Sequence, residues 1–406
     1  MTDLVIIGGG AAGIFCAANA ATLKEGLKVL VLEKSGKLLS KVKVSGGGRC
    51  NVTHACFDIV EMSKRYPRGQ NFVKKSFHEF FTTDTVNWFE ERGVKLKTEP
   101  DGRMFPTTDS SQTIIDCLMK EINQYGVELW MQADVIAVKK NENGFSVQLK
   151  DGRSVLTKAI CIATGGYAKP ESFAWIEALG HSIERPVPSL FTFNLPGHPI
   201  SKLMGVSVPT ARVRIQGTKL EQQGPLLITH WGLSGPAVLK SSAWGARELA
   251  ARNWNFSVQV NWMEEMKEND WRNLFQEQRV LHPRRAINRC PVSLPARLWE
   301  FLLYQSGLKP EQRWGELPAR ETNKLIQLLT AWEAEVKGKT TFKEEFVTAG
   351  GIKLSEIDPQ TCQSRIVPGL YFAGEIMDVD GVTGGFNFQH AWTSGFCVAK
   401  AVGIEK

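Results

Sequence analysis

The N-terminal end of the chain alternates short apolar runs with a segment of small residues. Residues 4–7 form an apolar run rich in β-branched side chains, which is typical of a buried parallel strand. Residues 11–22 are alanine-rich and predict a helix, and a second apolar run at 28–32 predicts another strand. Strand, helix and strand in this order predict a βαβ unit, and therefore an α/β fold with a parallel sheet.

Two later segments repeat the strand pattern. The run "AICIATGGYAKP", residues 159–170, is a buried apolar strand that ends in a Thr-Gly-Gly turn. Near the C-terminus, residues 370–373 predict a strand, a glycine-rich turn follows at 381–385, and a helix opens near Phe386. Both strands are expected to belong to the same domain as the N-terminal unit.

The middle of the chain has a different pattern. Residues 191–262 alternate in short β-like stretches separated by glycine and proline. Helical spacing prevails over residues 263–332, and strand-like stretches return after it. The side chains that fall on one helical face there are Leu325, Leu328, Leu329 and Trp332. The predicted domains are an α/β domain of residues 1–190 and 353–406, a β-rich domain of 191–262 and 336–352, and a helical insertion at 263–335.

Composition and charge narrow the class of protein. The 406 residues are 43% hydrophobic and 22% charged, which is ordinary for a soluble globular protein. No uncharged apolar run approaches the ~18 residues of a membrane span, and the N-terminus lacks the basic region of a signal peptide. We therefore expect a cytoplasmic protein with reduced cysteines, no membrane partner and no metal. The net charge of +7 permits an acidic partner or a phosphate-bearing cofactor.

The turn after the first strand carries the motif Gly8-x-Gly10-x-x-Gly13. The first glycine permits a tight turn, the second lets the backbone approach a pyrophosphate, and the third lets helix and strand pack closely. The pyrophosphate would lie against the N–H groups at the start of the helix. Glu33, at the end of the second strand, would accept hydrogen bonds from the adenosine ribose and disfavours NADP. The motif therefore predicts a dinucleotide site.

The C-terminal segment decides between FAD and NAD. A carboxylate at Glu375 or Asp378 suits the hydroxyls of a ribityl chain, and the N–H groups near Gly385 suit the electron-rich edge of a flavin. A cofactor contacted by both ends of the chain is long and extended, which favours FAD. No second GxGxxG follows a strand, so we expect no separate nicotinamide domain. The alternative is that these glycine-rich turns merely connect strands.

Residues 44–56, "VSGGGRCNVTHAC", combine glycines with two cysteines. Bare glycine backbone can pack against a flavin ring or phosphates. We expect Arg49 to face the pyrophosphate or an anionic substrate, and Cys50 and Asn51 to approach the flavin. Cys50 is either a packed small hydrophobe or, beside a flavin, a proton donor in the reduction of a C=C bond.

The candidate site residues come from these loops and their neighbours. The expected cofactor-binding residues are Gly8, Gly10, Ala11, Ala12, Gly13, Glu33, Lys34, Ser45, Gly46, Gly47, Arg49, Cys50, Asn51, Val135, Thr164, Gly165, Gly166, Gly374, Glu375, Asp378, Gly385, Phe386 and Asn387. The candidate catalytic residues are Cys50 and His230. His230 lies beside a predicted helix start, which favours a neutral imidazole, and a purely structural histidine is an equal alternative.

Six motifs occur in one order along the chain and resemble those of the HI0933-like flavoproteins, also called the YhiN or BaiN family. They are the GxGxxG turn, "SGGGRCN" at 45–51, "ATGG" at 163–166, "THWGLSGPA" at 229–237, "TAGGI" at 348–352 and "GEIMDVDGVTGGFNFQ" at 374–389. The resemblance covers essentially the whole chain. It implies non-covalent FAD and a two-dinucleotide-fold flavin domain that carries an inserted domain. The activities proposed for members are aminoacetone oxidation, reduction of unsaturated bile-acid intermediates and dihydrouridine formation in ribosomal RNA.

Two details of the 44–56 segment bear on this resemblance. His54 stands where members of the family usually have an asparagine. Cys50 and Cys56 resemble the active disulfide of glutathione-reductase-type enzymes, although the spacing differs.

These observations predict an FAD-dependent oxidoreductase that moves a hydride between flavin N5 and a substrate held between the α/β and β-rich domains. NAD(P)H is the expected transient reductant, and the expected substrate is a small amine or a metabolite with an activated C=C bond. The alternative is a ribosomal RNA dihydrouridine synthase that acts on a uridine, with basic stretches at 63–75 and 279–297 holding the RNA. If the protein does not bind RNA, each basic stretch is a solvent-exposed face with no partner.

Overall fold

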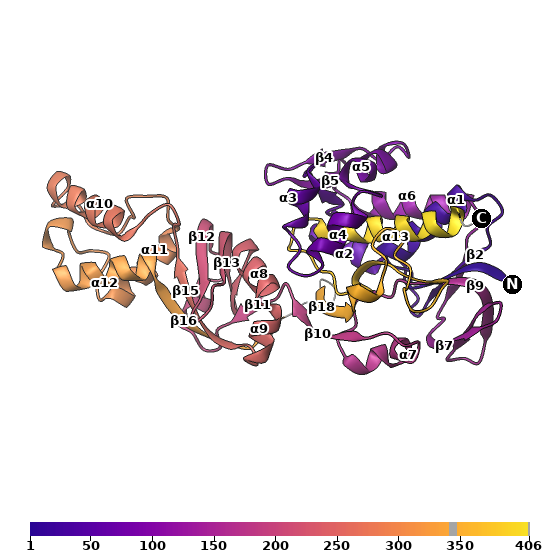
Figure 1. The fold of residues 1–406 in the computed structure, drawn as a ribbon. Coiled ribbons are helices and arrows are strands. Elements are labelled where there is room, and N and C mark those ends of the chain that lie inside the picture. Colours follow the sequence, from indigo (N-terminus) through magenta and orange to yellow (C-terminus); the bar gives the residue numbers. More distant parts are fainter. Residues whose placement is uncertain (341–346, 405–406) are drawn as a thin grey trace. The chain divides into compact units, whose positions relative to one another are not determined.

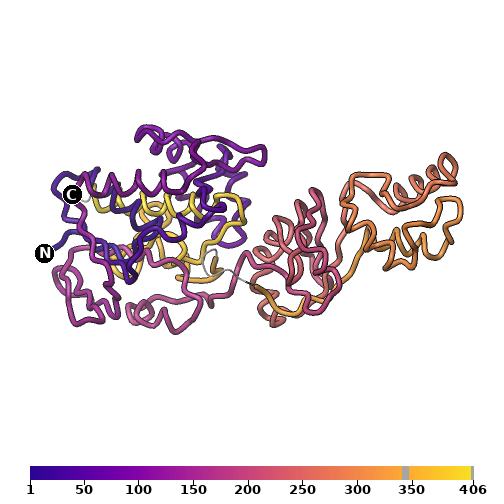
Figure 2. Tube along the Cα trace, turned by 180° about the vertical axis from the view of Figure 1, so that it is seen from behind, coloured from indigo at the N-terminus to yellow at the C-terminus, as the bar shows by residue number. Residues whose placement is uncertain are grey.

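The computed structural model describes residues 1–340 and 347–404, which fold into two compact units (Figures 1 and 2). The first unit is discontinuous, Met1–Ser189 with Phe342–Lys406, and the second, Leu190–Thr341, is inserted into it. This arrangement confirms the predicted α/β fold with an inserted β-rich domain. No helix within the described ranges is long and apolar enough to cross a membrane.

A mostly parallel sheet forms the centre of the first unit. Its strands are β1 (Thr2–Ile7), β2 (Val29–Glu33), β6 (Glu128–Met131), β7 (Val135–Asn141), β8 (Gly144–Leu149), β9 (Ser154–Ile162) and β19 (Leu370–Phe372). The parallel part runs β6-β2-β1-β9-β19, and β8 and β7 extend it in antiparallel fashion from β9. The residues of β1 from Leu4 onwards are buried, as expected for a parallel strand that is covered on both faces.

Two helices from opposite ends of the chain pack against each other in this unit, α1 (Ala11–Leu23) and α13 (Phe386–Ile404) (Figure 1). Small residues allow this close approach, because a Cβ at Gly395 would lie only 2.7 Å from the carbonyl oxygen of Ala12. Phe15 on α1 and Trp392 on α13 fill the remaining space, with ring centroids 5.2 Å apart. This contact brings together the N-terminal and C-terminal segments, which we predicted to bind the same cofactor.

Shorter elements surround this core. A small antiparallel sheet consists of β3 (Thr53–His54), β5 (Arg103–Pro106) and β4 (Leu96–Thr98). The helices are α2 (Ser40–Gly48), α3 (Ile59–Ser63), α4 (Gln70–Ser76), α5 (Thr82–Glu90), α6 (Ser111–Gln124) and α7 (Ala174–Glu177).

One expected boundary is corrected by strand pairing. β18 (Val347–Ile352), which we assigned to the β-rich domain, pairs antiparallel with β10 (Ile183–Ser189) of the first unit. Gly350 allows this approach, since a Cβ there would lie 2.6 Å from the Arg185 carbonyl oxygen of β10. Gly351 packs on another segment of the first unit, where a Cβ would lie 2.4 Å from the Ile376 carbonyl oxygen. Residues 341–346 of the predicted β-rich segment lie outside the described residues.

The second unit is built on one antiparallel sheet in the order β16-β15-β12-β13-β14-β11-β17. Its strands are β11 (Thr192–Asn194), β12 (Ser207–Ile215), β13 (Glu221–Thr229), β14 (Gly232–Ser234), β15 (Asn255–Asn261), β16 (Trp332–Lys337) and β17 (Lys339–Thr340). Helices α8 (Pro236–Trp244) and α9 (Ala246–Ala251) follow β14.

The predicted helical insertion contains three helices, α10 (Glu268–Leu281), α11 (Ala296–Ser306) and α12 (Ala319–Thr330). Trp271, Trp299 and Leu325 of these helices belong to the same buried core as Val258 of the sheet. The helices are therefore part of the second unit and have no separate core. Trp332 is not on the helical face we predicted, because it pairs with Val260 as the first residue of β16.

Candidate cofactor site

Three glycine-containing turns of the first unit follow neighbouring parallel strands. The GxGxxG turn follows β1, the Thr-Gly-Gly turn follows β9, and Gly374 and Glu375 follow β19. Because the carboxyl ends of neighbouring parallel strands meet at one edge of a sheet, these turns lie together although they are far apart in the sequence. That edge is where ligands bind in sheets of this type.

The three motif glycines are glycine for different reasons. A Cβ at Gly8 would lie 2.4 Å from the Ala163 carbonyl oxygen, and one at Gly13 would lie 2.0 Å from that of Gly8. A Cβ at Gly10 would meet no atom within 4 Å. Helix α1 starts at this open position with no side-chain cap and no acidic residue in its first turn. Two glycines therefore serve packing, and the third leaves the helix N-terminus accessible to an anion.

Glu33 holds the loop beside this helix start. One carboxylate oxygen accepts a hydrogen bond from the Gly9 N–H at 2.8 Å, and the other accepts one from the Ser35 N–H at 2.7 Å. The Ala133 N–H donates to the Glu33 carbonyl at 2.9 Å, so the segment leading to Val135 lies beside it. The side chain of Lys34, next to Glu33, is exposed.

The glycine run at 46–48 interrupts α2. Ser45, Gly46 and Gly47 have non-helical backbone angles, so the regular helix ends before them. Gly46 packs tightly, because a Cβ there would lie 2.8 Å from the ring of Phe105, whereas Gly47 and Gly48 have no atom in reach of an added Cβ. The run therefore has one packed end and an open backbone beyond it.

Cys50 follows this run in a conformation unusual for a residue with a side chain. Its φ is 62°, in the left-handed region, and its side chain is fully buried. Burial raises the pKa of the Cys50 thiol to about 12, so it keeps its proton at neutral pH. Cys56 is also a free thiol, and the disulfide suggested by the resemblance to glutathione-reductase-type enzymes is not formed.

The residues after Cys50 are tied to the start of α13. With its amide oriented to satisfy both neighbours, Asn51 accepts a hydrogen bond from the Gly385 N–H at 2.9 Å and donates to the Thr53 carbonyl at 3.0 Å. The His54 ring stacks on Phe386 with centroids 4.7 Å apart. The departure at His54 is thus accommodated by an aromatic contact. The two loops that we expected to meet at a flavin do lie together.

Asn387 closes the turn that leads into α13. Its side chain accepts a hydrogen bond from the Gly381 N–H at 2.8 Å and donates to the Gly381 carbonyl at 2.9 Å. The first turn of α13 carries no acidic residue.

Glu375 has two partners that the sequence did not indicate. Its carboxylate pairs with the Lys41 ammonium at 2.6 Å and accepts a hydrogen bond from the Thr348 N–H at 2.7 Å. The Thr348 hydroxyl is buried and has no hydrogen-bond partner among the described residues. A Cβ at Gly166 would lie 2.6 Å from this hydroxyl, whereas one at Gly165 would meet nothing within 4 Å. The Thr-Gly-Gly turn, like the first motif, combines one packed and one open glycine.

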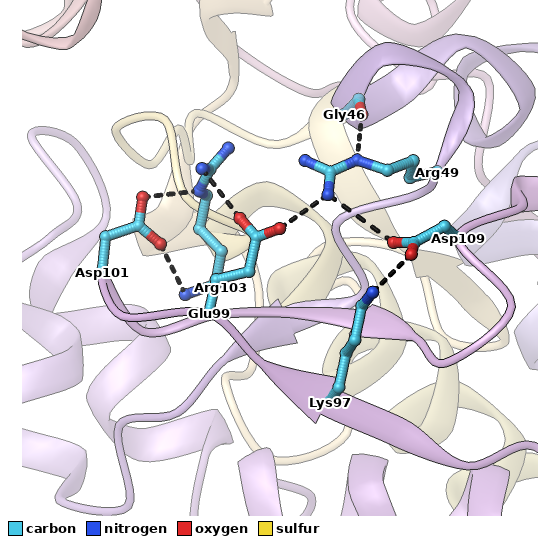
Figure 3. A network of polar contacts seen from close by, with 7 residues as sticks. All are labelled: Gly46, Arg49, Lys97, Glu99, Asp101, Arg103 and Asp109. Carbon is cyan, nitrogen blue, oxygen red and sulfur yellow. Dashed lines mark hydrogen bonds and ion pairs between the residues drawn. The ribbon is translucent and has the colours of Figure 1, made fainter.

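Arg49 lies in a network of charged side chains (Figure 3). Its guanidinium pairs with Glu99 at 2.6 Å and Asp109 at 3.6 Å, and stacks over the Phe105 ring at 4.0 Å. Lys97 pairs with Asp109, and further arginine–carboxylate contacts extend the network. Glu99 and Asp109 are therefore the charged partners of Arg49 in this structure, and contact with a pyrophosphate or an anionic substrate stays a prediction.

The basic stretch at 63–75 has a buried part and an exposed part. Tyr66 is buried and donates a hydrogen bond to the Phe386 carbonyl at 2.6 Å, and Phe72 is also buried. Arg68 forms a buried ion pair with Asp380, which also accepts a hydrogen bond from the Ser189 hydroxyl at 2.7 Å. Lys64, Arg65, Lys74 and Lys75 are exposed, so Arg68 and the two aromatic rings are the parts of this stretch that are used inside the protein. RNA contact by the exposed cations stays a prediction.

His230 lies in the second unit, on the exposed turn between β13 and β14. Its ring contacts Trp231, with centroids 4.3 Å apart. Strand β14 separates it from Pro236, where α8 begins, so the helix-terminus argument for a neutral imidazole does not hold.

The residues present fit an extended dinucleotide cofactor. Open backbone at Gly10, Gly47 and Gly165 leaves room along the loops, and the starts of α1 and α13 offer N–H groups without competing acids. Among residues 1–340 and 347–404, no cluster of three His, Cys, Asp or Glu side chains is placed to hold a metal ion.

Comparison with known proteins assigns the class. The family model described as "HI0933-like protein Rossmann domain" matches residues 2–401, and the chain belongs to this family of FAD-dependent oxidoreductases. A ribosomal RNA dihydrouridine synthase of Escherichia coli is 34% identical over 98% of this chain and 97% of its own. A 3-dehydro-bile acid delta(4,6)-reductase of Clostridium scindens is 27% identical over 99% of both chains.

A solved structure shows the same fold at low sequence identity. The 3-ketosteroid-delta4-(5alpha)-dehydrogenase of Rhodococcus jostii aligns over 98% of this chain and 96% of its own, with a TM-score of 0.52 and 14% identity.

Proposed function

We propose that this protein reduces a uridine in ribosomal RNA to dihydrouridine with non-covalently bound FAD. The observation that carries the proposal is the 34% identity to the Escherichia coli synthase over nearly the full length of both chains. A small metabolite with an activated C=C bond is the second candidate, which the Clostridium scindens reductase favours. The small amine of the sequence prediction has no comparable support.

The open loops of the first unit would hold FAD. The N–H groups of α1 beside Gly10 would bind the pyrophosphate, and Glu33 would exchange its backbone partners for the ribose hydroxyls. Glu375 and Asp378 would face the ribityl chain, and the start of α13 near Asn387 would face the flavin edge. When bound, FAD supplies hydride-transfer chemistry.

Saturation of the uracil ring adds a hydride to one carbon of the C5=C6 bond and a proton to the other. Cys50 is our candidate for the proton donor, because its loop is fixed to the start of α13, where the flavin edge would lie. Its raised pKa keeps the thiol protonated and also makes it a weaker acid than an ordinary thiol. His230 and water are the other candidate proton sources. The target base must leave the RNA stack to reach any such group.

NAD(P)H is the reductant we propose. The only GxGxxG turn that follows a predicted strand is the one at the N-terminus, so the nicotinamide cofactor would bind transiently and leave before the substrate reacts.

The test follows the flavin in the purified protein. The protein is reduced anaerobically with NADH or NADPH and then mixed with deproteinised ribosomal RNA. The expected result is reoxidation of the flavin together with loss of uridine absorbance. Reoxidation by a small enone but not by RNA would replace the first candidate by the second. A colourless protein that takes up no FAD would refute both.

A further inference from the structure

The net charge of the chain is confined to one of its two units. The second unit contains 20 Lys and Arg against 13 Asp and Glu, a net charge of +7. The first unit contains 29 of each and is neutral. The whole excess of positive charge therefore lies outside the unit that would hold FAD. An anion as large as RNA would be attracted mainly to the second unit.

Within the second unit, five arginines lie between residues 279 and 297, and they fall into two groups. Arg279 donates to the Leu317 carbonyl, and Arg297 donates to the Lys202 carbonyl at 2.7 Å, so both guanidinium groups are used within the protein. Arg284, Arg285 and Arg289 are exposed, and their guanidinium groups have no partner among the described residues.

The loop that carries the three exposed arginines, residues 282–289, is held by backbone hydrogen bonds. The Trp314 N–H donates to the Arg285 carbonyl at 3.1 Å, and the Ile287 N–H donates to the Gln312 carbonyl at 2.9 Å. Ile287 is buried, and its carbonyl accepts a hydrogen bond from the Trp299 indole at 2.7 Å. The loop is thus anchored while its arginines face solvent, so little ordering of the backbone is required on binding.

Apolar side chains continue this surface. Val280 and Leu281, at the end of α10, are 68% and 59% exposed and directly precede the loop. Large apolar residues that are exposed next to unpaired cations indicate a binding surface more than a solvated face.

We propose that the 282–289 loop, called the arginine loop below, binds the phosphate backbone of the RNA substrate. This inference rests on the proposed function for the identity of the partner. Guanidinium groups bind phosphate oxygens through paired N–H donors, and three of them on a loop that contains no acidic residue suit a polyanion. Val280 and Leu281 would contact the sugars or an unstacked base. An acidic protein is the competing partner.

The test compares two variants with the same loss of charge from the same unit. The first is R284Q/R285Q/R289Q. The control, R212Q/R252Q/R272Q, removes arginines that each pair with a glutamate, at 2.9, 2.7 and 2.6 Å respectively. Binding to a ribosomal RNA fragment is measured at several salt concentrations, and turnover of the same RNA is measured in parallel. Flavin absorbance and thermal unfolding verify that both variants are folded.

The arginine-loop variant should bind the RNA about 10- to 100-fold more weakly, and its plot of log affinity against log salt should be shallower by about 2–3. The control should stay close to the wild type, because its arginines already have protein partners. Turnover at saturating RNA should change little in either variant.

The outcomes separate the two proposals. If the wild type reduces RNA and the arginine-loop variant binds like the control, the arginine loop is refuted and the proposed function stands. If the wild type binds RNA through the arginine loop but does not reduce it, the proposed function falls and the loop assignment stands. If the wild type neither binds nor reduces RNA, both are refuted, and an acidic protein becomes the partner to test.

Discussion

Substitution of two motif glycines by alanine should separate cofactor binding from folding. At Gly10 the backbone is extended, with φ −86°, and an added Cβ meets no atom within 4 Å, so Gly10→Ala should fold normally without cofactor. At Gly13 the added Cβ would lie 2.0 Å from the Gly8 carbonyl oxygen, which cannot move away from the β1–α1 turn. Overpacking of this kind costs about 1–3 kcal/mol of unfolding free energy, or more.

The gain in stability on adding FAD should distinguish the same two variants in the opposite way, with Gly10→Ala losing most of the gain and Gly13→Ala keeping it. FAD at 100 times its Kd stabilises the folded wild type by about 2.7 kcal/mol. If the methyl group of Gly10→Ala fills the space meant for the pyrophosphate and weakens binding about 100-fold, this stabilisation falls to about 0.4 kcal/mol. Gly13→Ala should be less stable without FAD, and whatever folds should still gain stability from FAD.

The assay is chemical denaturation of the FAD-free proteins, repeated at fixed FAD concentrations, with FAD affinity measured by fluorescence quenching. If Gly10→Ala binds FAD as tightly as the wild type, the open space at Gly10 is not where the pyrophosphate approaches. If Gly13→Ala unfolds at the wild-type denaturant concentration, the Gly8 carbonyl yields to the added methyl group and Gly13 is not required for packing.

Three further predictions concern buried groups of the first unit. Burial lowers the pKa of His390 to about 4, so on acidification the unfolded state binds a proton before the folded state does. The free energy of unfolding should therefore fall by up to about 3 kcal/mol from pH 6.5 to pH 4. In His390→Leu, urea denaturation should show a smaller dependence of this free energy on pH, and an unchanged dependence would contradict the assignment. Arg68→Met leaves Asp380 buried without its cation and should cost about 3–5 kcal/mol in the same assay, whereas a cost below about 1 kcal/mol would mean that the pair is solvated. Cys50→Ala should slow flavin reoxidation by RNA about 100-fold, while flavin reduction by NAD(P)H is unchanged. Cys56→Ala is the control. Equal rates of flavin reoxidation in the two variants would leave Cys50 with a packing role.

The βαβ unit could be predicted from sequence because each of its signals is local. The apolar run at residues 4–7, the small residues of α1 and the glycine spacing all describe neighbours along the chain. The grouping of the turns after β9 and β19 with this unit also followed, since parallel strands present their carboxyl ends at one edge.

Other features depend on contacts between distant residues and could not be read in this way. β18 looks like a strand of either unit, and only its pairing with β10 assigns it to the first. Trp332 continues a helical pattern along the chain, yet its pairing with Val260 places it in a strand. The carboxylates that pair with Arg49 could not be predicted either, because Glu99 lies 50 residues further along the chain.

The two basic stretches show most clearly why the cations of a sequence overestimate the cations available to a partner. In the stretch at 63–75, Arg68 forms a buried ion pair and both aromatic rings lie in the core, whereas Lys64, Arg65, Lys74 and Lys75 are exposed and Lys64 pairs with Glu61. In the stretch at 279–297, three of five arginines lie exposed on an anchored loop without a partner among the described residues. Since the first unit is neutral, any salt-sensitive binding of RNA should come mainly from the second unit, and its salt dependence should report on these three side chains more than on the total charge of +7.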